Sequence, residues 1–131
     1  MTQSLAIRVR QHRGHVLITV AGEIDIATAP VLRDRLAPLA AAGRPVIADL
    51  TGVTFIDAAG LGVLAGAAGK AAASGGSLHV VTARQRVRRA FAVTGLDRTI
   101  PLARTRAEAL ASLHAGPGGT QPPAGPLARD R

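Results

Sequence analysis

A short, almost continuous apolar run, Val46-Ile47-Ala48-Asp49-Leu50, is soon followed by a helix-like segment of small residues that extends from Gly60 to Ser74. Apolar residues at nearly every position are typical of a strand that is covered on both faces. Small side chains allow a helix to approach its neighbours closely. A covered strand, a loop and a close-packed helix in this order predict an α/β fold with a mainly parallel sheet.

The same alternation recurs along the chain. Residues 5–10 and 15–20 form two strand-like runs on either side of a turn at residues 11–14, which predicts an antiparallel hairpin. Apolar residues recur at helical spacing from residue 29 to Gly43, with Thr28 as a possible N-cap and Pro30 in the first turn. Further strands are predicted at residues 77–82 and 99–102, and further helices at residues 85–93 and 106–114. We therefore expect an α/β sheet of four to five strands, mixed but mainly parallel, with about four helices.

A chain of 131 residues suits a single domain. We expect this domain to span residues 1–115 and to be followed by a flexible tail at residues 116–131, because Pro- and Gly-rich sequence cannot offset its ordering entropy. The chain has no cysteine and no charged-then-apolar signal pattern. Its longest apolar stretch, residues 58–73, is too short to span a bilayer. We therefore expect a cytoplasmic protein without a membrane span.

The chain is strongly basic, with a formal net charge of +8. Such a charge is compatible with nucleic-acid binding, but only 2% of the residues are aromatic, so stacking platforms are scarce. Composition therefore argues against a nucleic-acid partner. Five arginines crowd around the third predicted helix with only Asp97 opposing them: Arg84, Arg86, Arg88, Arg89 and Arg98. They form either a solvated basic face or a contact for an acidic partner.

Asp57 stands where the N-cap of the second helix belongs. Its carboxylate can accept a hydrogen bond from the amide of Ala59 or Gly60. The same free amides would stabilise a phosphate on the first helical turn, so a hydroxyl at residue 58 would make a charge switch. Ala58 and Ala59 have no hydroxyl group. The nearest hydroxyls, those of Thr51 and Thr54, are alternative phosphorylation sites, although we expect them to serve in strand and turn hydrogen bonds.

A second acidic loop, Gly22-Glu23-Ile24-Asp25, ends the second strand, and the topology places it beside Asp57. Two carboxylates could form a metal site or an acid–base pair. However, the four histidines lie elsewhere in the sequence, and no nucleophile or phosphate-binding loop accompanies the carboxylates. We therefore expect no catalytic residue, no metal and no cofactor. The Gly- and Ala-rich side of the second helix either packs against the sheet or forms a flat surface for another protein.

Three motifs in this order resemble the STAS domains of bacterial anti-sigma factor antagonists. They are residues 22–30 (GEIDIATAP, with Leu32 following), residues 46–50 (VIADL) and residues 55–64 (FIDAAGLGVL). The resemblance covers about residues 5–112. It implies binding to a kinase-type anti-sigma factor, which frees a sigma factor for transcription. In that family the kinase phosphorylates a serine just after the aspartate and so ejects the antagonist, whereas Ala58 occupies the matching position here.

Because of this alanine, we expect a phosphorylation-independent antagonist, and we expect it to be a monomer or a weak homodimer. Its expected partner-binding residues lie in the two acidic loops and the start of the second helix: Glu23, Asp25, Thr28, Asp57, Ala58, Ala59, Gly60, Leu61 and Gly62. The alternative is a STAS regulatory subunit of a transport or signalling assembly that is not linked to a sigma factor.

Overall fold

The computed structural model describes residues 4–114, which form a five-stranded sheet in the order β1-β2-β3-β4-β5. The first two strands are antiparallel, and the other neighbouring pairs are parallel. The strands are β1 (Ala6–Gln11), β2 (Val16–Ile24), β3 (Pro45–Ile56), β4 (Ser77–Val81) and β5 (Leu102–Ala103). The helices are α1 (Ala29–Ala41), α2 (Ala58–Ala73), α3 (Gln85–Thr94) and α4 (Arg106–His114), with a short 3-10 turn, η1 (Leu96–Arg98). The predicted α/β fold class is confirmed.

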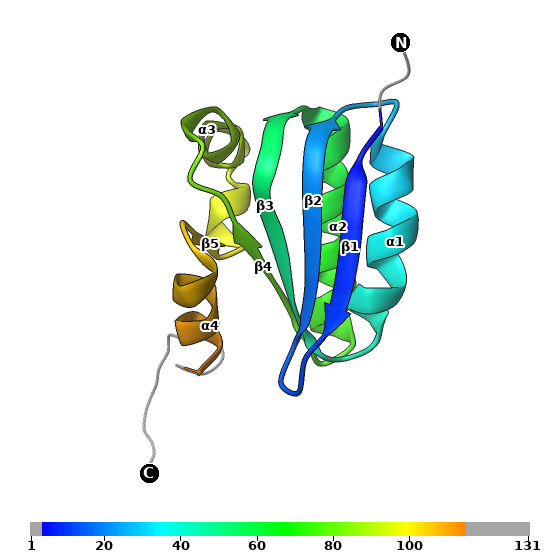
Figure 1. Cartoon of the computed structure of the whole chain (residues 1–131), viewed down its shortest axis with the longest axis vertical. Coiled ribbons are helices and arrows are strands. Elements are labelled where there is room, and N and C mark those ends of the chain that lie inside the picture. Colours follow the sequence, from blue (N-terminus) through cyan, green and yellow to red (C-terminus); the bar gives the residue numbers. More distant parts are fainter. Residues whose placement is uncertain (1–3, 115–131) are drawn as a thin grey trace.

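The helices cover the two faces of the sheet unequally. Helices α1 and α2 lie side by side behind β1, β2 and β3, whereas α4 lies near β4 (Figure 1). The larger apolar core joins β2 and β3 to α1, α2 and α3, with Ile18, Leu64 and Phe91 among its fully buried members. A smaller cluster on the opposite face packs Leu17 and Ile47 against α4.

The local predictions differ from the structure most clearly at β3, α2 and β5. Strand β3 does not end at Leu50 but continues through the segment expected as a loop, as far as Ile56. The second helix begins at Ala58 rather than Gly60, directly after Asp57. The last strand is shifted from residues 99–102 to Leu102–Ala103, because the chain first forms the turn η1.

Within residues 4–114, no helix has the length and apolarity that crossing a membrane requires. The predicted tail at residues 116–131 and the ends of the predicted domain lie outside the described residues.

Candidate functional site

Asp57 connects the end of β3 to the start of α2. Its backbone N–H donates to the carbonyl oxygen of Ile24 at 3.1 Å, which ties the loop to the end of β2. Its side-chain Oδ1 accepts from the amides of Ala59 at 2.9 Å and Gly60 at 3.2 Å. The predicted N-cap is confirmed, and the carboxylate faces the positive end of the helix dipole.

The Asp25 loop is built by its own hydrogen bonds. Asp25 Oδ1 accepts from the amides of Ala27 at 3.0 Å and Thr28 at 3.1 Å. The hydroxyl of buried Thr28 donates to the Glu23 carbonyl at 2.7 Å and accepts from the Asp25 amide at 2.9 Å. Thr28 is the N-cap residue of α1, as predicted, but its side chain makes no capping hydrogen bond, because this hydroxyl already closes the preceding loop.

The two acidic loops lie at the same end of the sheet, as predicted. Ile24 and Ile56, which precede Asp25 and Asp57, are partners in the parallel β2–β3 register. Both carboxylates accept hydrogen bonds from backbone amides, which is a structural role for each of them. Among residues 4–114, no group of three histidine or acidic side chains comes together as a metal ion would need.

The predicted site residues divide by burial. Glu23, Ala58 and Gly62 are exposed, and Asp25, Asp57 and Ala59 are partly exposed. The remaining three, Thr28, Gly60 and Leu61, are buried beneath the surface. These three residues therefore support the site from the interior and are not available for contact. The accessible surface consists of the acidic loops and the outer side of α2.

The glycines of α2 have two different environments. A Cβ added at Gly60 would lie 2.6 Å from Ile24 Cγ2 and 2.8 Å from Ile56 Cγ1, so only glycine fits there without a shift. Among the described residues, a Cβ added at Gly62, Gly66 or Gly69 would meet nothing within 4 Å beyond its chain neighbours and the adjacent backbone of its own helix. Close packing therefore explains Gly60, whereas the outer glycines leave a flat, open helix side.

Two apolar side chains in and after the Asp25 loop are exposed, and neither was predicted to belong to the site. Ile26, next to Asp25, is 80% exposed, and Val31, in the first turn of α1, is 49% exposed. Helix α1 packs beside α2. The signal that could have revealed Ile26 was an isoleucine within a polar turn, between Asp25 and Thr28.

Asp49 is a further polar residue that the sequence analysis did not select. Its side chain is only 5% exposed and pairs with Arg106 of α4, with Nε 2.5 Å from Oδ2. The Thr51 hydroxyl also donates to Asp49, at 2.5 Å, so Thr51 has the hydrogen-bonding role that was expected of it. Burial opposes ionisation, but the hydrogen bonds from Thr51 and Arg106 outweigh it and hold the pKa of Asp49 below its ordinary value.

Two of the arginines around α3 have structural contacts. Arg84 Nε donates to the Val53 carbonyl at 3.1 Å, and Arg88 donates to the Thr82 carbonyl at 2.8 Å. These bonds fasten α3 and its N-cap residue to β3 and to the residue that follows β4.

The sequence of the chain is similar to that of known proteins. The STAS domain model matches residues 6–109. The anti-sigma-B factor antagonist of Bacillus subtilis is 36% identical over 99 residues, which cover 76% of this chain and 91% of that protein. The anti-sigma-F factor antagonist RsfB of Mycobacterium tuberculosis is 31% identical over 114 residues, 86% of this chain and 93% of its own.

A solved structure supports the same assignment. The crystal structure of an anti-sigma factor antagonist from Mycobacterium paratuberculosis superposes with a TM-score of 0.77 at 33% identity, covering 84% of this chain and 94% of that one. The family model matches most of the chain, the two sequence relatives are matched over nearly their whole length, and the fold agrees. The chain belongs to the STAS domain family.

Proposed function

We propose that this STAS domain is an anti-sigma factor antagonist, which binds a kinase-type anti-sigma factor and thereby releases a sigma factor for transcription. The proposal is carried by the near full-length similarity to proteins named anti-sigma factor antagonists. A regulatory role by binding, without catalysis, also fits carboxylates that are already bonded to backbone amides. We place this activity in the cytoplasm, where sigma factors act.

The proposed contact surface comprises the exposed parts of the two acidic loops and the outer side of α2. Ala58 lies at the junction of these parts, as the exposed first residue of α2. The open space around Gly62 and Gly66 would let a partner approach the helix backbone closely. The exposed side chain of Ile26 would add apolar area at the edge of the contact.

Ala58 makes the proposed interaction independent of phosphorylation at this position. A phosphate here would be attracted by the amides at the start of α2 and would add charge to the contact. Alanine has no oxygen to accept a phosphate and resembles unphosphorylated serine in size. The domain would therefore remain in its binding form.

The test is the affinity of the purified chain for the kinase-type anti-sigma factor of its host, for wild type and Ala58→Glu. We expect glutamate to weaken binding at least about tenfold, because the new charge would be desolvated in the contact. The matched control is Ala73→Glu, which introduces the same charge at an exposed position at the other end of α2. Equal affinities for wild type and Ala58→Glu would exclude this docking surface.

Affinity capture from the host with wild type and Ala58→Glu would distinguish the alternative function. Capture of transport or other signalling subunits, equally by wild type and Ala58→Glu, would indicate a regulatory subunit that is not linked to a sigma factor. Phosphopeptide mapping of the protein from its host would test Thr51 and Thr54, both of which are exposed. We expect a monomer or a weak homodimer, because the edge strand β1 carries exposed Arg8 and Arg10, which hinder pairing with a second copy. Analytical ultracentrifugation would test this expectation.

A further inference from the structure

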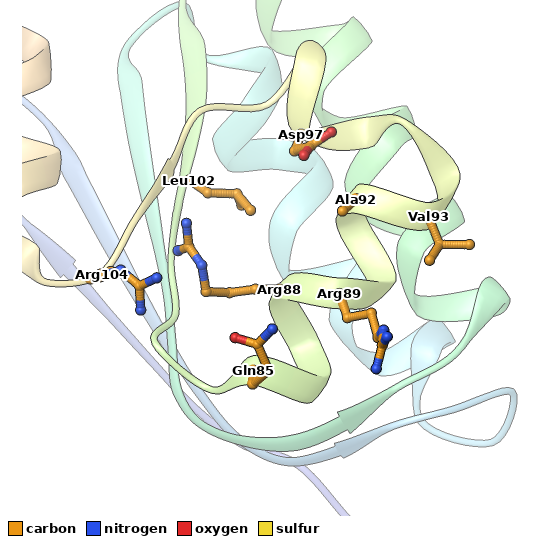
Figure 2. A pocket seen from close by; sticks show the side chains of 8 residues that line it. All are labelled: Gln85, Arg88, Arg89, Ala92, Val93, Asp97, Leu102 and Arg104. Atoms are coloured by element: carbon orange, nitrogen blue, oxygen red, sulfur yellow. The ribbon is translucent and has the colours of Figure 1, made fainter.

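A concave surface lies away from the acidic loops, between α3, η1 and β5 (Figure 2). Its volume is about 560 Å³. The lining residues are Gln85, Arg88, Arg89, Ala92, Val93, Asp97, Leu102 and Arg104. We call this surface the arginine cavity. It shares no residue with the proposed contact surface around Ala58.

The arginine cavity has an excess of positive charge. Three arginines line it against one carboxylate, that of Asp97. Within residues 4–114, ion pairs form only between Arg33 and Asp34 and between Arg106 and Asp49, so the cavity arginines have no ion-pair partner in that part of the chain. The excess charge is therefore available to an incoming anion.

Arg88 and Arg104 approach the cavity from different elements. Arg88 extends from α3 toward the side where Leu102 and Arg104 lie, whereas Arg89 points to the other side of the helix (Figure 2). The hydrogen bond from Arg88 to the Thr82 carbonyl holds its guanidinium in place while leaving further N–H donors. Arg104 follows β5, and its backbone N–H donates to the Glu108 carboxylate at 2.8 Å. That carboxylate does not line the cavity.

The chemistry of the lining indicates the kind of ligand. A guanidinium presents a planar fork of donors that matches a carboxylate, and two of them can hold two neighbouring carboxylates. The cavity also has apolar atoms, since Leu102 is half-buried within it and Val93 is 79% exposed. A protein segment with acidic and apolar side chains can use both properties, whereas a free inorganic anion would use only the charge.

Nucleic acid suits the arginine cavity less well. Single strands bind by stacking their bases on aromatic side chains, and no aromatic residue lines this cavity. We propose that the arginine cavity is a docking site for an acidic segment of a protein partner, with Arg88 and Arg104 binding its carboxylates.

The probe for this proposal is an octapeptide of alternating glutamate and leucine, titrated into the full-length chain and followed by backbone amide NMR shifts. We expect shifts concentrated at residues 85–104 and an affinity that falls between 50 mM and 500 mM salt, because salt screens exposed charges. Arg104→Gln should weaken binding about two- to fivefold, which is the range for one exposed ion pair.

The matched control is Arg35→Gln, because Arg35 is an exposed arginine on α1, remote from the cavity, and the substitution changes the net charge equally. It should leave the affinity within a factor of two. Arg104 is chosen in preference to Arg88 because its guanidinium is not used to fasten the fold. Ala58→Glu should bind the peptide like wild type, so this test is independent of the proposed antagonist function.

Three outcomes would overturn the proposal. Equal losses for Arg35→Gln and Arg104→Gln would show a net-charge effect without a site. Peptide shifts outside residues 85–104 would place the binding elsewhere. Inorganic phosphate or a single-stranded oligonucleotide that binds more tightly than the peptide, with the same dependence on Arg104, would assign the cavity to a phosphate ligand.

Discussion

The two faces of the sheet are stabilised in different ways. The face under α1 and α2 is apolar and tightly fitted, with Ile18, Val20 and Leu64 fully buried. The face under α4 has a smaller apolar cluster and also carries polar side chains, because Asp49 and His79 alternate along their strands with residues of the larger core. Asp49 is paired with Arg106, whereas His79 bonds Ser77 through Nε2 and has no partner for Nδ1 among residues 4–114.

The two faces of the sheet should therefore be destabilised by different kinds of substitution. The face under α1 and α2 depends on close packing, so an added methyl group should destabilise it more than a changed charge. The second depends on a charge pair, so it should respond to pH and to loss of an arginine. Burial also lowers the pKa of His79, which keeps this imidazole neutral on the second face at pH 7.

The largest expected effect is that of Gly60→Ala on the first face. The new Cβ would lie 2.6 Å from Ile24 Cγ2 and 2.8 Å from Ile56 Cγ1. Ile24 is fully buried and β-branched, so it cannot easily turn away. We expect a loss of about 1–3 kcal/mol in the free energy of unfolding, measured by urea denaturation. An unchanged midpoint would show that this face is not tightly fitted.

On the second face, we expect Arg106→Ala to destabilise the fold by about 1–2 kcal/mol, because the buried Asp49 carboxylate would lose a charged partner. The effect is reduced by the exposure of the Arg106 side chain, which is 54%. Arg33→Ala is the matched control, since its ion pair with Asp34 is exposed on both sides and should contribute less than about 0.5 kcal/mol. Equal losses for the two variants would contradict a special role for the buried pair.

The Asp49–Arg106 pair should also make the free energy of unfolding sensitive to acid. The loss at low pH should be smaller than the loss in Arg106→Ala, because a protonated Asp49 can still form hydrogen bonds. The pKa of Asp49 is lowered in the folded state, so the folded state binds its proton less readily than the unfolded state does. Its contribution is therefore fully present above the ordinary aspartate pKa of about 3.9 and is lost as the pH falls through the folded value. Urea midpoints measured between pH 7 and pH 3 should fall less steeply in Asp49→Asn, and parallel curves would contradict this role.

The contrast between the faces also explains what the sequence could predict. Helical spacing and strand alternation predicted most helices and strands, because apolar packing imposes those periods. The parallel topology also predicted that Asp25 and Asp57 lie at one end of the sheet. The Asp49–Arg106 contact joins residues 57 positions apart. No local pattern specifies such a pair, so it became visible only in the folded chain.

The unexpected length of β3 also depends on a contact with a distant part of the chain. Gly52 lies in the segment that was predicted to be a loop, yet it is paired with Ala21 beside a register shift in the β2–β3 ladder. A Cβ at Gly52 would lie 2.8 Å from the Cβ of Ala21. The glycine therefore marks a close approach of two strands rather than the end of one. Thr28 is at the predicted N-cap position, but no local pattern shows that its hydroxyl bonds the preceding loop instead of the helix.

The smallest expected effect has the opposite sign and concerns the outer side of α2. Gly66→Ala places a methyl group in open space within a helix, where alanine is favoured over glycine by about 0.5–1 kcal/mol. We expect the urea midpoint to rise, in contrast to Gly60→Ala in the same helix. If the outer side of α2 contacts the anti-sigma factor, Gly66→Ala should also weaken binding while it stabilises the fold. A more stable variant with reduced affinity would show that Gly66 serves the contact, whereas a more stable variant with full affinity would confine the contact to the loops and the first turn of α2.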